Sequence, residues 1–248
     1  MVRRIRYISI FLLGVGLFSC SKKVATISSA KYIHISESEE SAKIQNAISP
    51  YRGDLQAKMR QVVGVADNPL EKGKPNAPLG NYLSDLMVSY VRENLGIRNV
   101  DAAIFNNGGF RIPLPGDTIR VETIFELMPF ENELVVVEMP ADSMYSLATY
   151  LQKRGGEPIS NDVELEIING KVERYLVGKE MINREKTYYV LTSDYLSGGG
   201  DNMSFFRGLK VQNTGVKLRD AIIVAMTEEY NAGKKASGKI DNRLSIKL

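Results

Sequence analysis

The sequence predicts an α+β fold with mixed β-sheets flanked by helices. Segments with helical and strand-like hydrophobic spacing alternate along the 248 residues, but without a regular strand–helix–strand rhythm. Two alternating runs flank an Asn169-Gly170 pair, which predicts an antiparallel hairpin. Hydrophobic residues make up 44% of the chain and charged residues 25%, as is usual for globular domains.

The first 20 residues predict a signal peptide. Three arginines precede an apolar run that is too short to span a bilayer comfortably and that ends in Leu17-Phe18-Ser19-Cys20. This stretch resembles a lipobox, so we expect Cys20 to carry a lipid that holds the protein on the periplasmic side of a bacterial envelope membrane. The alternative is a free thiol or a small buried hydrophobic residue. Because no other cysteine is present, disulfides and thiolate metal sites are excluded.

Net charge gives no reason to expect a nucleic acid partner. The formal charge of +3 falls to zero once residues 1–20 are removed, because their only charged side chains are Arg3, Arg4 and Arg6. The mature chain therefore lacks the excess of positive charge that binds polyanions.

Two further segments follow the signal peptide. Residues 21–35 are expected to form a polar tether that ends in a short strand with the only histidine, His34. A lone histidine in such a strand is more often structural than catalytic. Residues 36–248 are long enough for one large domain.

The first part of this domain reads as helices and a loop. Residues 36–65 have a helical pattern that Pro50 divides into two pieces. Residues 66–78 are rich in Pro, Asn and Gly, which predicts a surface loop. A helix is expected over residues 79–96, with Gly96 as its stop. Its apolar face consists of Leu79, Leu83, Leu86, Tyr90 and Val91.

The middle of the domain reads as two strands and two helices. An apolar strand over 100–105 leads into an Asn-Asn-Gly-Gly turn, and a short helix is expected over 123–128. A strand over 133–140 is followed by a helix over 141–156. For that helix, Asp142 is the expected N-cap and Gly155 the expected stop.

The last part adds the hairpin and the end of the sheet. The hairpin covers residues 163–177 and is followed by a strand that runs directly into the glycine loop before Asp201. A helix is expected over 218–233, and residues 239–248 are expected to form a final edge strand.

The usual catalytic motifs are missing from the sequence. One histidine cannot assemble the His-rich two-metal clamp that is common in phosphoesterases. The chain also lacks GxxxxGK[ST], GxGxxG, GxSxG and HExxH. A hydrolase with an all-carboxylate metal site stays open as an alternative, although no clustered spacing of Asp and Glu supports it. We expect no catalytic residue, no metal site and no cofactor in this chain.

Loops at strand ends are the candidates for ligand contacts. The turn Asn106-Asn107-Gly108-Gly109 frees backbone N–H groups, and Arg111 follows with a fork of donors suited to carboxylate, phosphate or sugar hydroxyls. The alternative is a tight turn next to a surface arginine.

Two aromatic residues and a carboxylate lie in similar loops. Phe130 is either a core residue or a stacking platform. Tyr195 precedes Asp201 by six residues across a loop where a flat ring could lie close to the backbone. Asp201 is expected to accept a hydrogen bond from a sugar hydroxyl or to orient Arg111; the alternative is a turn closed by an Asx-type hydrogen bond. The loop contains Gly198, Gly199 and Gly200.

Four ordered motifs together resemble the C-terminal domain of the 5′-nucleotidase family, which includes UDP-sugar hydrolases and ecto-5′-nucleotidases. They are APLGNYLSDLM (77–87), NNGGFR (106–111), MPFEN (128–132) and SDYLSGGGD (193–201). The resemblance covers the chain from about residue 40 to the end. In that family, an N-terminal metallophosphoesterase domain carries two metals and a catalytic His-Asp pair, and the C-terminal domain binds the nucleoside end of the substrate.

The resemblance implies a role for five residues. Asn106 and Arg111 would contact the ribose and orient the substrate, Phe130 and Tyr195 would stack on the base, and Asp201 would bind the ribose. Tyr195 replaces the more usual Phe. Where the family tends to carry an arginine before the LGN segment, this chain has only lysines, Lys72 and Lys74. The Asn-His-Glu or Asn-His-Asp catalytic motif is absent from the sequence.

The resemblance therefore implies the nucleotide-recognition half of a split periplasmic nucleotidase. A separate metallophosphoesterase polypeptide would supply the divalent metals and the catalysis. The alternative is a nucleoside- or nucleotide-binding lipoprotein with no catalytic role. Stacking tolerates any base, and the sequence leaves open both the base and whether the natural ligand is a monophosphate, a nucleotide sugar or a cyclic nucleotide.

Overall fold

Strand β4 (Glu133–Pro140) organises the fold because both of its faces are apolar. Successive side chains of a strand point to opposite faces. Leu134 and Val136 pack in one hydrophobic core, and Val135 and Val137 pack in a second core on the other side. A strand that is buried on both faces needs a covering layer on each side of its sheet.

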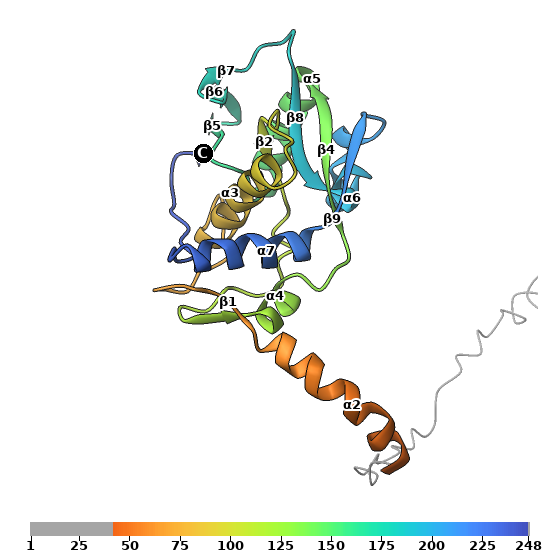
Figure 1. Ribbon diagram of the computed structural model, residues 1–248. Coiled ribbons are helices and arrows are strands. Elements are labelled where there is room, and N and C mark those ends of the chain that lie inside the picture. Colours follow the sequence, from red (N-terminus) through yellow and green to blue (C-terminus); the bar gives the residue numbers. More distant parts are fainter. Residues whose placement is uncertain (1–41, 248) are drawn as a thin grey trace, which may run out of the picture. The chain divides into compact units, whose positions relative to one another are not determined.

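The structure is a computed structural model that describes residues 42–247 (Figure 1). The expected signal peptide (1–20) with Cys20, and the expected tether (21–35) with His34, lie outside the described residues. The helices are α2 (Ala42–Met59), α3 (Pro78–Glu93), α4 (Val121–Leu127), α5 (Ala141–Arg154), α6 (Asp194–Ser197) and α7 (Leu218–Asn231). The other strands are β1 (Val62–Val65), β2 (Ala102–Ala103), β3 (Thr118–Arg120), β5 (Val163–Ile168), β6 (Lys171–Val177), β7 (Glu180–Met181), β8 (Thr187–Ser193), β9 (Val211–Lys217) and β10 (Leu244–Lys247).

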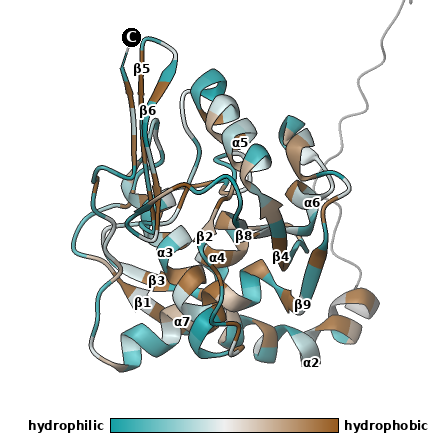
Figure 2. Ribbon diagram, turned by 90° about the horizontal axis from the view of Figure 1, so that it is seen from above, coloured by the Kyte–Doolittle hydropathy of each residue, from teal (hydrophilic) through white to brown (hydrophobic). Residues whose placement is uncertain are grey.

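The central sheet has the strand order β2-β8-β4-β9. Strand β2 runs parallel to β8, whereas β4 is antiparallel to both β8 and β9. Helices α3 and α7 cover one face of this sheet and α5 covers the other (Figure 2). The expected α+β fold with mixed sheets between helices is confirmed.

The second sheet has the order β10-β5-β6-β7 and packs in the same core as α5. Strands β5 and β6 form the expected antiparallel hairpin, with Asn169 and Gly170 at φ of 49° and 80°. These left-handed angles are those of the tight hairpin turn that Asn-Gly pairs favour. The expected final edge strand is β10, which pairs in parallel with β5.

Two expectations about the first elements are wrong. Helix α2 continues through Pro50 instead of dividing there. Its side chains around Pro50 are exposed, so solvent surrounds the backbone where the proline removes a hydrogen bond. Residues 62–65, expected to be helical, form β1 and pair with β3. Three valines in four positions favour an extended chain once a partner strand is available.

The helices that follow agree with the pattern except at one cap. All five apolar residues expected on the face of α3 are buried, and Gly96 beyond its end has a φ of 67°. Helix α5 begins at Ala141 with Pro140 as its N-cap, so Asp142 lies in the first turn and is not the cap. Gly155 ends α5 in the left-handed conformation, as expected. None of the helices within residues 42–247 is long and apolar enough to cross a membrane.

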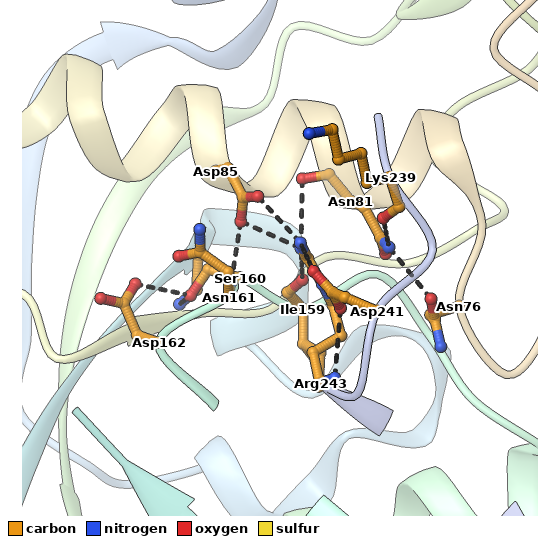
Figure 3. Close-up of polar contacts among 11 residues, drawn as sticks. Asn76, Asn81, Asp85, Ile159, Ser160, Asn161, Asp162, Lys239, Asp241 and Arg243 are labelled. Atoms are coloured by element: carbon orange, nitrogen blue, oxygen red, sulfur yellow. Dashed lines mark hydrogen bonds and ion pairs between the residues drawn. The ribbon is translucent and has the colours of Figure 1, made fainter. Parts of the chain in front are cut away.

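A buried arginine joins the C-terminal segment to the rest of the fold (Figure 3). The Arg243 residue is 3% exposed, and its guanidinium donates to Asp85 Oδ2 at 2.9 Å and to Asp241 Oδ2 at 2.7 Å. It also donates to the backbone carbonyl of Ile159 at 2.9 Å. Burial raises the pKa of Asp85, although hydrogen bonds from Arg243 oppose the rise. One side chain thus links α3, the segment before β5 and the segment before β10.

We predict that Arg243→Met lowers the free energy of unfolding by about 3–5 kcal/mol, because it leaves the two carboxylates without their buried partner. Urea denaturation at pH 7 measures this change. The control is Lys247→Met, which removes the exposed pair with Glu166 and is expected to cost at most about 1 kcal/mol. Equal effects of the two substitutions would contradict the prediction.

Candidate functional site

Strand directions bring three of the four motifs to one end of the central sheet. Because β2 is parallel to β8 and β4 is antiparallel to it, the ends of β2 and β8 and the start of β4 coincide. The Asn-Asn-Gly-Gly turn follows β2, the glycine loop follows β8, and MPFEN precedes β4. Leu134 and Ser193 are directly paired in the sheet, so the MPFEN segment and the start of the glycine loop are neighbours.

These loops surround a cleft of about 290 Å³. Its volume is near the small end of the range of about 300–1,000 Å³ found for small-molecule sites. All five residues expected to bind substrate contribute to it, and Asn132 joins them. The lining residues are Asn106, Gly108, Gly109, Arg111, Phe130, Asn132, Tyr195 and Asp201.

Both candidate stacking rings are open to solvent. Phe130 is 40% exposed and Tyr195 is 48% exposed, whereas Phe105 and Phe110 are each 1% exposed. Phe130 is therefore not a core residue. An aromatic side chain left this open at a cleft is available for contact with a flat apolar surface.

The glycine loop lets the Tyr195 ring lie against the backbone, as expected. A Cβ atom at Gly200 would lie 2.5 Å from Cε1 and Cζ of the Tyr195 ring. Gly199 has a φ of 91°, which favours glycine. Gly198 has ordinary backbone angles and ends α6, a short helix that the sequence pattern did not predict. Ser193 accepts a hydrogen bond from the Leu196 N–H at 3.3 Å and so caps that helix.

Asp201 connects two of the three loops. Its Oδ1 accepts a hydrogen bond from the Tyr195 hydroxyl at 3.0 Å, and its Oδ2 accepts one from Asn106 Nδ2 at 2.5 Å. Its backbone carbonyl accepts from the Tyr150 hydroxyl of α5 at 3.0 Å. A carboxylate has about four acceptor positions, so room is left for a donor from a ligand. Asp201 orients Asn106 and Tyr195 rather than Arg111.

Arg111 is exposed at the edge of the cleft. Its Nη1 donates to the Gly108 carbonyl at 3.2 Å, and its guanidinium carbon lies 5.9 Å from the centre of the Phe130 ring. The hydrogen bond to Gly108 uses one of the five N–H donors of the guanidinium. Lys72 and Lys74 do not line the cleft, and Lys74 instead donates to the carbonyl of Arg154 at the end of α5.

Sequence reasoning missed a buried carboxylate beneath the Asn-Asn-Gly-Gly turn. Glu157 is 1% exposed, and its Oε2 accepts from the backbone N–H of Asn107 at 2.7 Å and from Asn107 Nδ2 at 3.1 Å. Its other oxygen accepts from Arg154 Nε at 3.2 Å. No local pattern in the sequence predicts the contact between Glu157 and the turn, because Asn107 lies 50 residues away.

Asn132 is a second cleft residue that sequence reasoning missed, although it belongs to the MPFEN motif. It lines the cleft beside Phe130. An amide both donates and accepts hydrogen bonds, so it can contact the polar edge of a flat ligand.

The described residues offer no cluster of metal ligands. Within residues 42–247, no three or more His, Cys, Asp or Glu side chains gather closely enough to hold a metal ion. The cleft itself offers one carboxylate, Asp201, whose oxygens already accept hydrogen bonds.

The fold and the cleft define a mixed-sheet α+β domain with two exposed aromatic rings over a network of polar loops. Residues 62–147 match the family model described as 5′-nucleotidase, C-terminal domain. The fold as a whole is that of these domains: the 5′-nucleotidase precursor from Thermus thermophilus superposes with a TM-score of 0.67 at 22% identity. That match covers 82% of this chain and 42% of the Thermus chain.

Two curated relatives are similar in sequence. The trifunctional nucleotide phosphoesterase protein YfkN of Bacillus subtilis is 24% identical over 227 residues, which is 83% of this chain and 15% of YfkN. Protein UshA of Escherichia coli K12 is 21% identical over 178 residues, which is 70% of this chain and 32% of UshA. The chain thus corresponds to less than half of each of these proteins.

We predict that Gly200→Ala lowers the free energy of unfolding by about 1–3 kcal/mol, because the new methyl group would overlap the Tyr195 ring. Gly198→Ala is the matched control, since its Cβ would meet only ordinary contacts at 3.5 Å and its φ is −73°. Urea denaturation compares the two variants, and a crystal structure of Gly200→Ala is expected to show the ring displaced. Equal stabilities would contradict the overlap.

We also predict that the contribution of Tyr150 to the free energy of unfolding depends on pH. Burial raises its pKa to about 12, with the Glu157 carboxylate adding to the rise, whereas the ordinary value is 10.0. Tyr150→Phe is expected to lower the free energy of unfolding by about 1 kcal/mol at pH 8, through loss of the bond to Asp201. A group whose pKa is raised by folding stabilises fully below its unfolded pKa and loses that contribution as pH rises through the folded pKa.

The difference between wild type and Tyr150→Phe should therefore shrink as pH rises from about 10 to about 12. Urea denaturation of both proteins at pH 8 and pH 11 measures it. A difference that stays constant or grows would contradict the assignment.

Proposed function

We propose that this chain is the nucleotide-recognition half of a split periplasmic phosphohydrolase of the 5′-nucleotidase or UDP-sugar hydrolase type. Residues 36–248 would form the recognition domain, and Cys20 and residues 21–35 would anchor and tether it to the membrane. The observation that carries the proposal is the cleft, where two open aromatic rings stand beside a carboxylate, an amide and an arginine.

Each group in the cleft fits one part of a nucleoside. The rings of Phe130 and Tyr195 would stack on the base, and stacking contributes about 1–3 kcal/mol per base whatever its hydrogen-bonding pattern. Asp201 accepts hydrogen bonds and Asn106 offers an amide, so together they suit ribose hydroxyls. Arg111 would approach the sugar from the edge of the cleft and help to orient the substrate.

Hydrolysis would depend on a second polypeptide. The described residues offer no metal cluster, so no step of phosphate cleavage is assigned to them. A separate metallophosphoesterase domain would supply divalent metals, and binding of the nucleoside here would place the phosphate at those metals. The relatives' greater lengths are consistent with this division, since this chain spans 15% of YfkN and 32% of UshA.

A binding protein without a catalytic partner is the second candidate. All the groups proposed to contact the nucleoside lie within this one cleft, so binding does not itself require another chain. The two candidates differ only in whether a bound nucleotide is then cleaved.

Calorimetry with the full chain in detergent tests recognition. Adenosine, AMP and uridine are expected to bind, and Phe130→Ala or Tyr195→Ala should weaken each about 5- to 150-fold, which corresponds to the loss of about 1–3 kcal/mol of stacking. Tyr230→Ala is the matched control, because Tyr230 is 38% exposed but lies outside the cleft. If wild type binds none of the three ligands, the proposed recognition role is wrong.

Phosphate release distinguishes the two candidates. The chain is mixed with a separately prepared metallophosphoesterase domain from the same envelope, and hydrolysis of AMP is measured with and without it. A rate above that of the metal-bearing domain alone, lost in Tyr195→Ala, supports the split enzyme. Nucleoside binding with no gain in rate supports the non-catalytic binding protein.

A further inference from the structure

A buried arginine at the start of α7 holds the loop that carries Phe130. Arg219 is 6% exposed, although it is charged and lies close to an open cleft. A buried arginine is normally paired with carboxylate or carbonyl oxygens. The partners of Arg219 therefore show which segment it stabilises.

Three of those partners lie in one loop, residues 128–131. Arg219 Nη1 lies 3.4 Å from the carbonyl oxygens of both Met128 and Phe130, and Nη2 donates to Glu131 Oε1. The guanidinium also lies over the ring of Phe125 in α4, 4.2 Å from its centre. The planar fork of arginine can make several directed contacts from one position, which a lysine cannot do.

Two neighbours of Arg219 reinforce the same loop. The Leu218 N–H donates to the Asn132 carbonyl at 2.8 Å, and Lys217 donates to the second oxygen of Glu131. Hydrogen bonds from Lys217 and from Arg219 lower the pKa of Glu131 to about 2. Glu131 is ionised at neutral pH, so its ion pairs with Lys217 and Arg219 are both present there.

The Phe130 ring needs this support because burial does not hold it. The residue is 40% exposed, and Arg111 is the side chain that approaches its face, at 5.9 Å. The place of the ring in the cleft is then fixed by its backbone. Arg219 contacts that backbone without lining the cleft.

We propose that Arg219 is a positioning residue for ligand binding, which acts by fixing the backbone that presents the Phe130 ring. The proposal rests on the proposed function, because it gives Arg219 an effect on nucleoside affinity that passes through Phe130. A residue that acts through another has little effect once the other is removed.

A double-mutant cycle tests this with the full chain and adenosine. Arg219→Met is expected to weaken binding about tenfold in wild type but less than about twofold when Phe130 is already alanine. Arg219→Lys, which keeps a charge for Glu131 but lacks the fork, should be intermediate and serves as the test variant if Arg219→Met does not fold. Arg174→Met is the matched control, because it breaks only the exposed ion pair with Glu164 on the β5–β6 hairpin, and it should change affinity less than about twofold.

Amide hydrogen exchange gives a second measurement that needs no ligand. Arg219→Met should speed exchange of the Leu218 amide, which bonds to the loop, about tenfold more than exchange of amides in the middle of α7. Wild-type affinity in Arg219→Met, or equal losses with and without Phe130, overturns the proposal. If wild type fails to bind adenosine, the recognition role is wrong, but the exchange measurement still tests Arg219. Unchanged exchange at Leu218 in Arg219→Met would show that Arg219 does not fix the loop.

Discussion

The burial of β4 on both faces is the constraint from which the rest of the structure follows. Because β4 needs a partner on each edge and a cover on each face, β8 and β9 lie antiparallel to it and helices pack on both sides. Because β2 is parallel to β8, these directions place the start of β4 and the ends of β2 and β8 at one end of the sheet. The loops that continue from these three strand ends therefore lie side by side and form the cleft.

The loops around the cleft are held in place mainly by hydrogen bonds from three charged side chains. Asp201 joins the tyrosine loop to Asn106, Glu157 supports the turn after β2, and Arg219 supports the segment before β4. Each support makes hydrogen bonds to its loop without a ligand, so the cleft is organised before any ligand arrives. Such preorganisation reduces the ordering that binding would otherwise require.

The sequence was sufficient to predict most elements whose pattern is strong and local. The hairpin at Asn169, the apolar face of α3 and the helix α7 follow from spacing alone. It was insufficient where tertiary partners decide: β1 is a strand only because β3 pairs with it, and the exposed edge strand β9 has no alternation to reveal it. In the cleft, ordered motifs identified the lining residues, whereas the supports at Glu157 and Arg219 depend on contacts across 50 and about 90 residues.

The backbone at the end of the glycine loop restricts how this cleft can change over evolution. Asp201 and Asn202 both have left-handed backbone angles, with φ of 49° and 66°. Among residues with a side chain, Asp and Asn tolerate that conformation best, so a longer acid such as Glu is disfavoured at position 201. The aromatic positions carry no such restriction. Divergence in ligand preference is therefore expected to accumulate at the rings, while the carboxylate at position 201 stays the same.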